Sequence, residues 1–223
     1  DPGPYPIPDI APIEGWPFYN QDGSSEIDES YKSLDKMQRE GKGDRHVLVL
    51  DPYAKKLYEF YAGYKTDSGW RAAQATIFDL TSNKMRPQGW TSTDAAGLSV
   101  FAATVRYPDV QDGIVSHVIR VTVRRTRNAY VYPATHAASR LDDSNLPRMG
   151  ERFRLKESVD ISHFSPHAQA IAKGMKKYGL IVADNGLDWL ISISPDKRFT
   201  GLDDLRKLKP NDFEVIIPTE PVK

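Results

Sequence analysis

The chain has 223 residues, in which 30 lysines and arginines are balanced by 30 aspartates and glutamates. A net charge of zero argues against nucleic acid or an anionic membrane as the general partner, because neither would be attracted to such a surface. The chain contains no cysteine, which excludes disulfides, thiolate nucleophiles and cysteine-ligated metals. No apolar run is long enough to span a membrane, and the mean hydropathy of −0.53 is typical of a folded soluble protein.

The N-terminal region, residues 1–43, is predicted to be a proline-rich arm followed by an amphipathic helix. Six of the first 17 residues are prolines, which favour an extended backbone. Isoleucine, tyrosine and tryptophan alternate with them, so we expect the arm to pack on the domain. The helix is expected over residues 24–40, capped by Ser24 or Ser25 and ended by Gly41. The chain begins at Asp1 rather than methionine, which suggests a processed or trimmed product.

Residues 44–223 are predicted to form a single domain of short strands. A hairpin is expected from residues 46–50 and 56–62 around the turn at 51–54. Further strands are expected at 71–80, 100–105, 114–123, 129–132 and 152–156. A second hairpin is expected from 180–183 and 189–194 around Asp184-Asn185-Gly186, and a last strand at 213–217.

Two helices interrupt the strands. Ser165 and Pro166 mark the start of one helix, and Gly179 marks its end. A short helix is expected at about 202–208. Many short strands with two or three helices predict a mainly β fold, either a β-sandwich or a jelly roll.

Common catalytic signatures are absent. The sequence has no phosphate-binding glycine loop, no Gly-x-Ser-x-Gly elbow and no His-Glu-x-x-His helix. We expect no cofactor and assign no metal ligand. A calcium ion bound by loop carboxylates stays open, although no loop has the spacing of a known calcium motif.

Histidines and carboxylates are the candidate catalytic groups. His117 falls on the otherwise apolar face of the 114–123 segment, where it is either a hydrogen-bonded core residue or a functional one. His136 lies near a strand end, with the same two interpretations open. Glycosidic hydrolysis usually needs two carboxyl groups in different protonation states. Asp94, in the loop Trp90-Thr-Ser-Thr-Asp-Ala-Ala-Gly97, and Asp184 are the candidate pair.

The candidate substrate-binding residues are aromatic, basic or amide side chains around the same segments. Aromatic rings can stack on sugars, although core packing is the competing explanation for each. Arginine can bind the carboxylate of a uronic acid, although arginines near strand ends are commonly solvated. The candidates are Trp90, Arg120, Tyr132, Asn185 and Trp189.

Long motifs resemble a family of exported bacterial and fungal proteins. They are the segments at 1–8, 43–51, 86–98, 146–156 and 177–186, including Gly43-Asp-Arg-His-Val, Leu146-Pro-Arg-Met-Gly and Lys177-Tyr-Gly-Leu-Ile-Val-Ala-Asp-Asn-Gly186. The resemblance covers nearly the whole chain and implies export, to the periplasm or the medium, and a shared β-rich fold. It implies no activity and assigns no catalytic residue.

Three functions remain open from the sequence. The first is an exported carbohydrate-active hydrolase that cleaves a polysaccharide, with Asp94 and Asp184 as acid and base or nucleophile, positioned by His117 and His136. The second is a lyase acting on a uronic acid polymer, with Arg120 or Asn185 binding the sugar carboxylate and His117 or Tyr132 removing a proton. The third is a non-catalytic sugar-binding or surface-assembly module.

Overall fold

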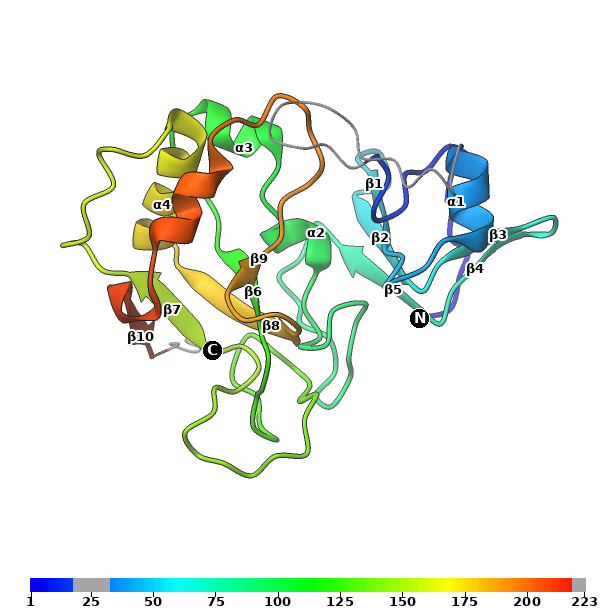
Figure 1. Cartoon of the computed structure of the whole chain (residues 1–223). Helices are drawn as coiled ribbons and strands as arrows, with labels where there is room; N and C mark the ends of the chain where they lie inside the picture. The colour runs from blue at the N-terminus through cyan, green and yellow to red at the C-terminus, as the bar shows by residue number, and fades with distance from the viewer. Residues whose placement is uncertain (18–32, 218–223) are drawn as a thin grey trace.

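The computed structural model describes residues 1–17 and 33–217 of the chain (Figure 1). Within these residues more of the chain is in strands than in helices, and the strands form three sheets. The prediction of a mainly β fold with few helices is confirmed. None of the helices in this part of the chain is long and apolar enough to cross a bilayer.

The N-terminal sheet consists of three antiparallel strands in the order β1-β2-β5. These are β1 (Val47–Asp51), β2 (Lys56–Tyr61) and β5 (Gln74–Asp79). The predicted first hairpin is confirmed, and the Asp51 carboxylate accepts the backbone N–H groups of Tyr53 and Ala54 in its turn. A separate pair, β3 (Tyr64–Thr66) and β4 (Gly69–Arg71), follows β2.

Residues 1–17 and helix α1 (Leu34–Glu40) pack against this sheet. Ala11 and Ile13 are buried with Val47 and Phe60 in one core cluster. Gln38 of α1 donates to the carbonyls of Asp9 and Ala11, which fixes the arm to the helix. Ser33 caps α1 and Gly41 ends it, whereas the expected first part of this helix, 24–32, lies outside the described residues.

The C-terminal sheet has five strands in the order β10-β7-β8-β6-β9. They are β6 (Ile119–Val123), β7 (Arg152–Leu155), β8 (Leu180–Asn185), β9 (Leu190–Ile191) and β10 (Phe213–Ile216). Strands β6 and β8 are parallel, and the other pairs are antiparallel. The carboxyl ends of β6 and β8 therefore meet at one edge, where Val123 lies beside Asn185.

Helix α4 (Pro166–Lys177) packs on the five-stranded sheet through its apolar face. It starts after Ser165, as predicted. Gly179 follows it with φ of +79°, and a side chain there would meet the carbonyl of Phe153, so glycine is required. The remaining helical segments are α2 (Val100–Ala103), α3 (Tyr107–Gln111), η1 (Leu202–Lys207) and η2 (Pro210–Asp212).

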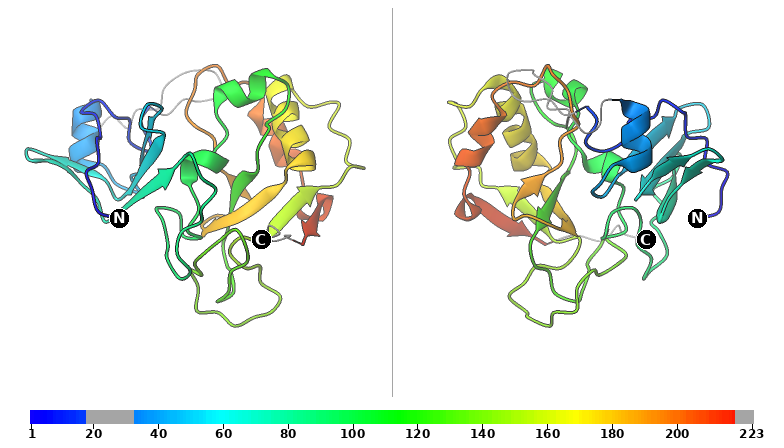
Figure 2. Two further views of the ribbon diagram at one scale, coloured as in Figure 1. Left: turned by 180° about the vertical axis from the view of Figure 1, so that it is seen from behind. Right: turned by 45° about the vertical axis from the view of Figure 1, so that its right-hand side comes forward.

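The two larger sheets lie side by side, each with its own core cluster, and α2 lies between them (Figures 1 and 2). The Trp90–Gly97 loop also lies where these two parts of the molecule meet, since it bonds residues of both. The long segment from 124 to 150 forms loops beyond the ends of β6 and β8 (Figure 2).

Three sequence predictions of secondary structure are wrong. Residues 100–103 form helix α2 rather than a strand, because Ser99 caps the segment. The 114–123 strand begins only at Ile119, so His117 precedes it. Strands β8 and β9 do not form a hairpin, because β6 lies between them and pairs with both. Of the expected 129–132 strand, a single bridge from Tyr130 to Met149 is present.

Candidate functional site

The Trp90–Gly97 loop has no regular secondary structure and is held by its own polar side chains. Ser92 Oγ donates to the Leu98 carbonyl and accepts the N–H of Asp94 at 2.9 Å. Thr91 Oγ1 donates to the Asp94 carbonyl at 3.1 Å. Gly97 has φ of +79°, and a side chain there would meet Thr135 and the Trp90 carbonyl. These contacts fix the position at which Asp94 enters the protein interior.

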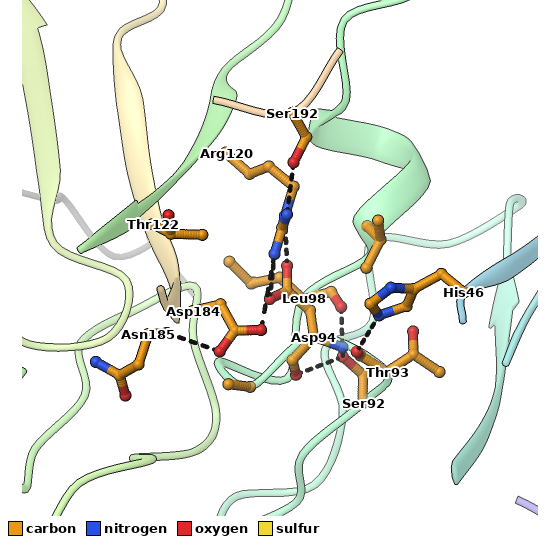
Figure 3. A network of polar contacts seen from close by, with 12 residues as sticks. His46, Ser92, Thr93, Asp94, Leu98, Arg120, Thr122, Asp184, Asn185 and Ser192 are labelled. Atoms are coloured by element: carbon orange, nitrogen blue, oxygen red, sulfur yellow. Dashed lines mark hydrogen bonds and ion pairs between the residues drawn. The ribbon is translucent and has the colours of Figure 1, made fainter. Parts of the chain in front are cut away.

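Asp94 is completely buried and paired with Arg120 of β6. Arg120 Nε donates to Asp94 Oδ2 at 3.1 Å, and Arg120 Nη2 donates to Oδ1 at 2.9 Å (Figure 3). Burial raises the pKa of Asp94, and Arg120 opposes that effect. Because both oxygens accept from a permanently charged group, the geometry is that of an ionised carboxylate. A buried charge of this kind is stable only when it is paired.

Asp184, near the end of β8, is the second carboxyl group beside Arg120. Its Oδ2 lies 3.9 Å from Arg120 Nη2, its Oδ1 accepts the N–H of Asn185 at 2.7 Å, and 28% of its side chain is exposed. Burial, followed by the negative charge of Asp94, raises the pKa of Asp184 to about 6, although Asn185 and Arg120 both oppose the shift. Asp184 can therefore exchange a proton with solvent near pH 6, whereas Asp94 is closed to solvent.

Backbone hydrogen bonds bring His136 to the same loop. Ala96 N donates to Ala183 O at 2.9 Å, next to Asp184, and Thr135 N donates to Ala96 O at 2.9 Å, next to His136. His136 Nδ1 lies 2.9 Å from the Ala95 carbonyl. Since a carbonyl only accepts, Nδ1 carries a proton, and the lone pair of the neutral ring is on Nε2.

His46, at the residue before β1, holds the loop from the other side. Its Nδ1 lies 2.9 Å from Glu14 Oε2, and its Nε2 lies 3.0 Å from the Thr93 carbonyl (Figure 3). Both partners are acceptors, so both ring nitrogens donate and the ring is an imidazolium. Burial lowers the pKa of His46, but Glu14 and Thr93 outweigh that effect and raise it to about 8.

Glu59 of β2 is a further buried carboxylate that contacts the loop. It accepts from Thr93 Oγ1 at 2.6 Å and Ser99 Oγ at 2.7 Å, and from the N–H groups of Val100 and Phe101 at 3.2 and 3.0 Å. Four hydrogen-bond donors therefore satisfy this carboxylate. Two of them are N–H groups at the start of α2, which have no acceptor within the helix itself. Glu59 therefore joins the N-terminal sheet to both the loop and α2.

The structure brings together part of the predicted site. Asp94 and Asp184 both lie beside Arg120, Asn185 donates its N–H to Asp184, and His136 contacts the Ala95 carbonyl in the same loop as Asp94. Asn185 also donates to Thr126 Oγ1 at 3.1 Å, so it fixes the turn after β6. Trp90, in the same loop as Asp94, is 52% exposed.

Other predicted site residues have separate partners. His117 lies between the Val118 carbonyl, at 2.8 Å from Nδ1, and the Asp109 carboxylate, at 3.3 Å from Nε2. Trp189 stacks on Phe213 with ring centres 4.9 Å apart, so it is a packing residue. Tyr132 lies in the 131–134 turn, which hydrogen-bonds to Met149.

The placement of Arg120 bears on the lyase hypothesis. Its Nε and Nη2 are bound by Asp94, its Nη1 donates to Ser192 Oγ at 2.6 Å, and its side chain is 9% exposed. It is not available to bind a sugar carboxylate. His117, one of the two expected bases in that mechanism, is bound to Asp109, and the other, Tyr132, lies in the turn beside Met149.

Three residues of the network were not singled out from the sequence: Glu14, His46 and Glu59. His46 belongs to the Gly43-Asp-Arg-His-Val motif, which was the available signal. Glu59 stands in a strand in which Leu57 through Phe60 are all buried. Because both faces of the strand are covered, an alternating pattern could not show that this carboxylate is inside. Within the described residues there is no group of three histidine or acidic side chains that could hold a metal ion.

Comparison with protein-family models, with curated proteins and with solved structures finds no match to this chain.

Proposed function

We propose that this protein is an exported carbohydrate-active enzyme that hydrolyses glycosidic bonds in a polysaccharide, with Asp184 as the general acid. The observation that carries the proposal is the contrast between two neighbouring carboxyl groups. Asp94 is ionised and buried, whereas Asp184 is partly exposed and has a pKa of about 6. Carboxyl groups whose environments separate their protonation states are typical of acid–base catalysis on glycosides.

In this proposal Asp184 donates its proton to the oxygen of the leaving sugar. A carboxyl group that is half protonated near pH 6 combines a sufficient protonated fraction with a ready proton transfer. His136 is the group proposed to take a proton from the attacking water, because its Nδ1 is bound to the Ala95 carbonyl and Nε2 is therefore the ring nitrogen left for proton transfer. Asp94 lies too deep to be the second catalytic carboxylate that the sequence suggested.

Trp90 is the proposed sugar-stacking residue of the site. Its indole is half exposed, its backbone N–H donates to the Pro87 carbonyl at 3.0 Å, and its backbone carbonyl accepts from Thr135 Oγ1 at 2.7 Å. The Arg86 guanidinium lies 5.6 Å from the ring centre. The backbone at Trp90 is therefore fixed, and its half-exposed ring offers an apolar surface to the C–H face of a sugar.

The first test is a panel of polysaccharides assayed in parallel for new reducing ends and for ultraviolet absorbance. We expect reducing ends without absorbance, and activity that falls as pH rises above about 6, because Asp184 then loses its proton. Replacing Asp184→Asn should lower kcat by about a hundredfold to ten-thousandfold.

The other outcomes separate the alternatives. Absorbance that rises together with reducing ends would identify β-elimination and contradict the hydrolase. Binding of a polysaccharide with no cleavage in the whole panel would favour the non-catalytic module. Full activity of the Asp184→Asn variant would rule out the assigned acid.

A second test concerns Trp90. In the inactive Asp184→Asn background, Trp90→Ala should weaken polysaccharide binding about tenfold, equivalent to roughly 1.4 kcal/mol. Affinity electrophoresis in gels containing the polysaccharide measures this directly. The matched control is Tyr53→Ala, since Tyr53 is 97% exposed in the β1–β2 turn, far along the chain from the loop. Equal losses in the two variants would contradict a specific role for Trp90.

A further inference from the structure

Two carboxyl groups compete for one guanidinium at this site. Arg120 gives two hydrogen bonds to Asp94 and one to Ser192, and only its Nη2 approaches Asp184, at 3.9 Å. Figure 3 shows the guanidinium directed at Asp94, with Asp184 to one side of it. Arg120 is therefore the counterion of Asp94, and Asp184 is close to that cation without receiving a direct hydrogen bond from it.

Burial explains which carboxyl group holds the cation. Asp94 is completely buried, so an unpaired charge on it would be strongly destabilising. Asp184 is 28% exposed, so it can be solvated or protonated without a partner. The two-bond geometry with Asp94 also has the better alignment, because a guanidinium matches a carboxylate through two parallel donors.

We propose that Asp94 is a positioning residue that occupies the Arg120 guanidinium and so prevents it from becoming the counterion of Asp184. This inference deepens the proposed function, on which it depends for its catalytic meaning. The buried Asp94 carboxylate thereby keeps the partly exposed Asp184 available as a proton donor. If Asp94 lost its charge, Arg120 would need another partner, and Asp184 is the nearest carboxylate to it.

The charged groups that face this pair come from several segments. Asp94 in the loop and Asp44 before β1 add negative charge near Asp184, whereas Arg120 on β6 adds positive charge. Arg120 also interacts electrostatically with Glu14 of the arm and with the His46 imidazolium. None of these other groups is within the ion-pair distance of Arg120 that Asp94 and Asp184 reach, so exchange between those two carboxyl groups dominates.

The experiment is to titrate the Asp184 carboxyl carbon by NMR in the full chain, with the Asp184→Asn spectrum used for assignment. In Asp94→Asn the negative charge beside Asp184 is removed and Arg120 is free to pair with Asp184, so the pKa of Asp184 should fall well below its native value, toward the ordinary range of an aspartate. In the double variant Asp94→Asn, Arg120→Gln the competing cation is absent, so that pKa should rise again.

A matched control is Asp188→Asn. Asp188 lies in the turn that follows Asp184. It pairs with the exposed Arg124, at 3.4 Å, and makes no ion pair with Arg120. Its loss should leave the pKa of Asp184 unchanged. If Asp94→Asn does not fold, the double variant, which carries neither buried charge, is compared with the native protein. Because Asp94 holds Arg120 in the native protein, the pKa of Asp184 should be nearly the same in both.

The inference is overturned by an unchanged pKa of Asp184 in Asp94→Asn, by equal values in the single and double variants, or by a pKa in the double variant far above the native value. The titration needs no substrate. A native protein that cleaves no polysaccharide, but shows the expected shifts, would therefore remove the proposed function and leave the charge exchange standing.

Discussion

Asp184 destabilises the folded protein when it is ionised. Its pKa is raised from an ordinary 3.8 to about 6, so the folded state binds this proton more tightly than the unfolded state does. The stabilisation that the bound proton gives the folded state is complete below about pH 4 and is lost as pH rises through 6. A raised pKa of this kind is typical of a residue retained for its chemistry rather than for stability.

Replacing Asp184→Asn should therefore increase the unfolding free energy at pH 8 by about 2 kcal/mol, after allowance for partial exposure. At pH 4 the variant and the native protein should be nearly equal, because the native carboxyl group is protonated there. Urea denaturation at both pH values measures the difference. A variant that is less stable than the native protein at pH 8 would show that ionised Asp184 is a structural ion-pair partner.

Individual residues of the site could be named from the sequence, but their contacts could not. Asp94 and Asp184 were singled out because glycosidic hydrolysis needs two carboxyl groups and both residues fall in a loop or turn between predicted strands. That both lie beside Arg120 depends on the parallel pairing of β6 with β8, and the sequence favoured a hairpin of 180–183 with 189–194 instead. The Asp184-Asn185-Gly186 signal marks a chain reversal correctly, but it does not say which strand lies alongside.

Helix α2 shows how a distant residue decides a local structure. Residues 100–105 are apolar except for Thr104 and include two valines, so they resemble a strand. Ser99 caps the segment. The Glu59 carboxylate, about 40 residues earlier in the chain, accepts the first two N–H groups of the helix. By contrast, the β1–β2 hairpin and α4 were predicted well, because their turn and capping residues are local.

Replacing Glu59→Gln should destabilise the protein by about 2 to 3 kcal/mol. The amide presents an N–H group to donors that need an acceptor, so at least one hydrogen bond to Thr93, Ser99 or α2 is lost. Chemical denaturation measures the effect. The same change at the exposed Glu214, which pairs with Arg154, should alter stability by less than about 0.5 kcal/mol. Similar losses at both positions would contradict the role given to Glu59.

The whole molecule is joined across its two cores by buried polar contacts. His46 and Glu59 belong to the N-terminal part, and both bind Thr93, one through its carbonyl and one through its hydroxyl. Asp94, the next residue, binds Arg120 of the C-terminal sheet. The position of the loop therefore depends on both parts, and the protonation of His46 affects how firmly they are held together.

Stability should fall by about 2 kcal/mol between pH 6.5 and pH 9 because of His46. Its folded pKa of about 8 exceeds the ordinary 6.5, so its stabilising effect is complete below 6.5 and is lost as pH rises through 8. Urea denaturation across this range should show the slope in the native protein and its absence in His46→Gln. His163→Gln, at an exposed histidine, should keep the slope. An unchanged slope in His46→Gln would show that another group is responsible.

The contacts of Arg120 also have a consequence for the order of folding. Arg120 bonds Asp94, 26 residues before it, and Ser192, 72 residues after it. Closing chain segments of this length is entropically costly, so such contacts form after local hairpins and helices. A nascent or partly folded chain can hold the β1–β2 hairpin and α4 while the acidic pair is still apart. The contacts that Arg120 makes with Asp94 and Ser192 therefore form late in folding, and the raised pKa of Asp184, which depends on burial and on the nearby Asp94, is a property of the assembled fold rather than of any one segment.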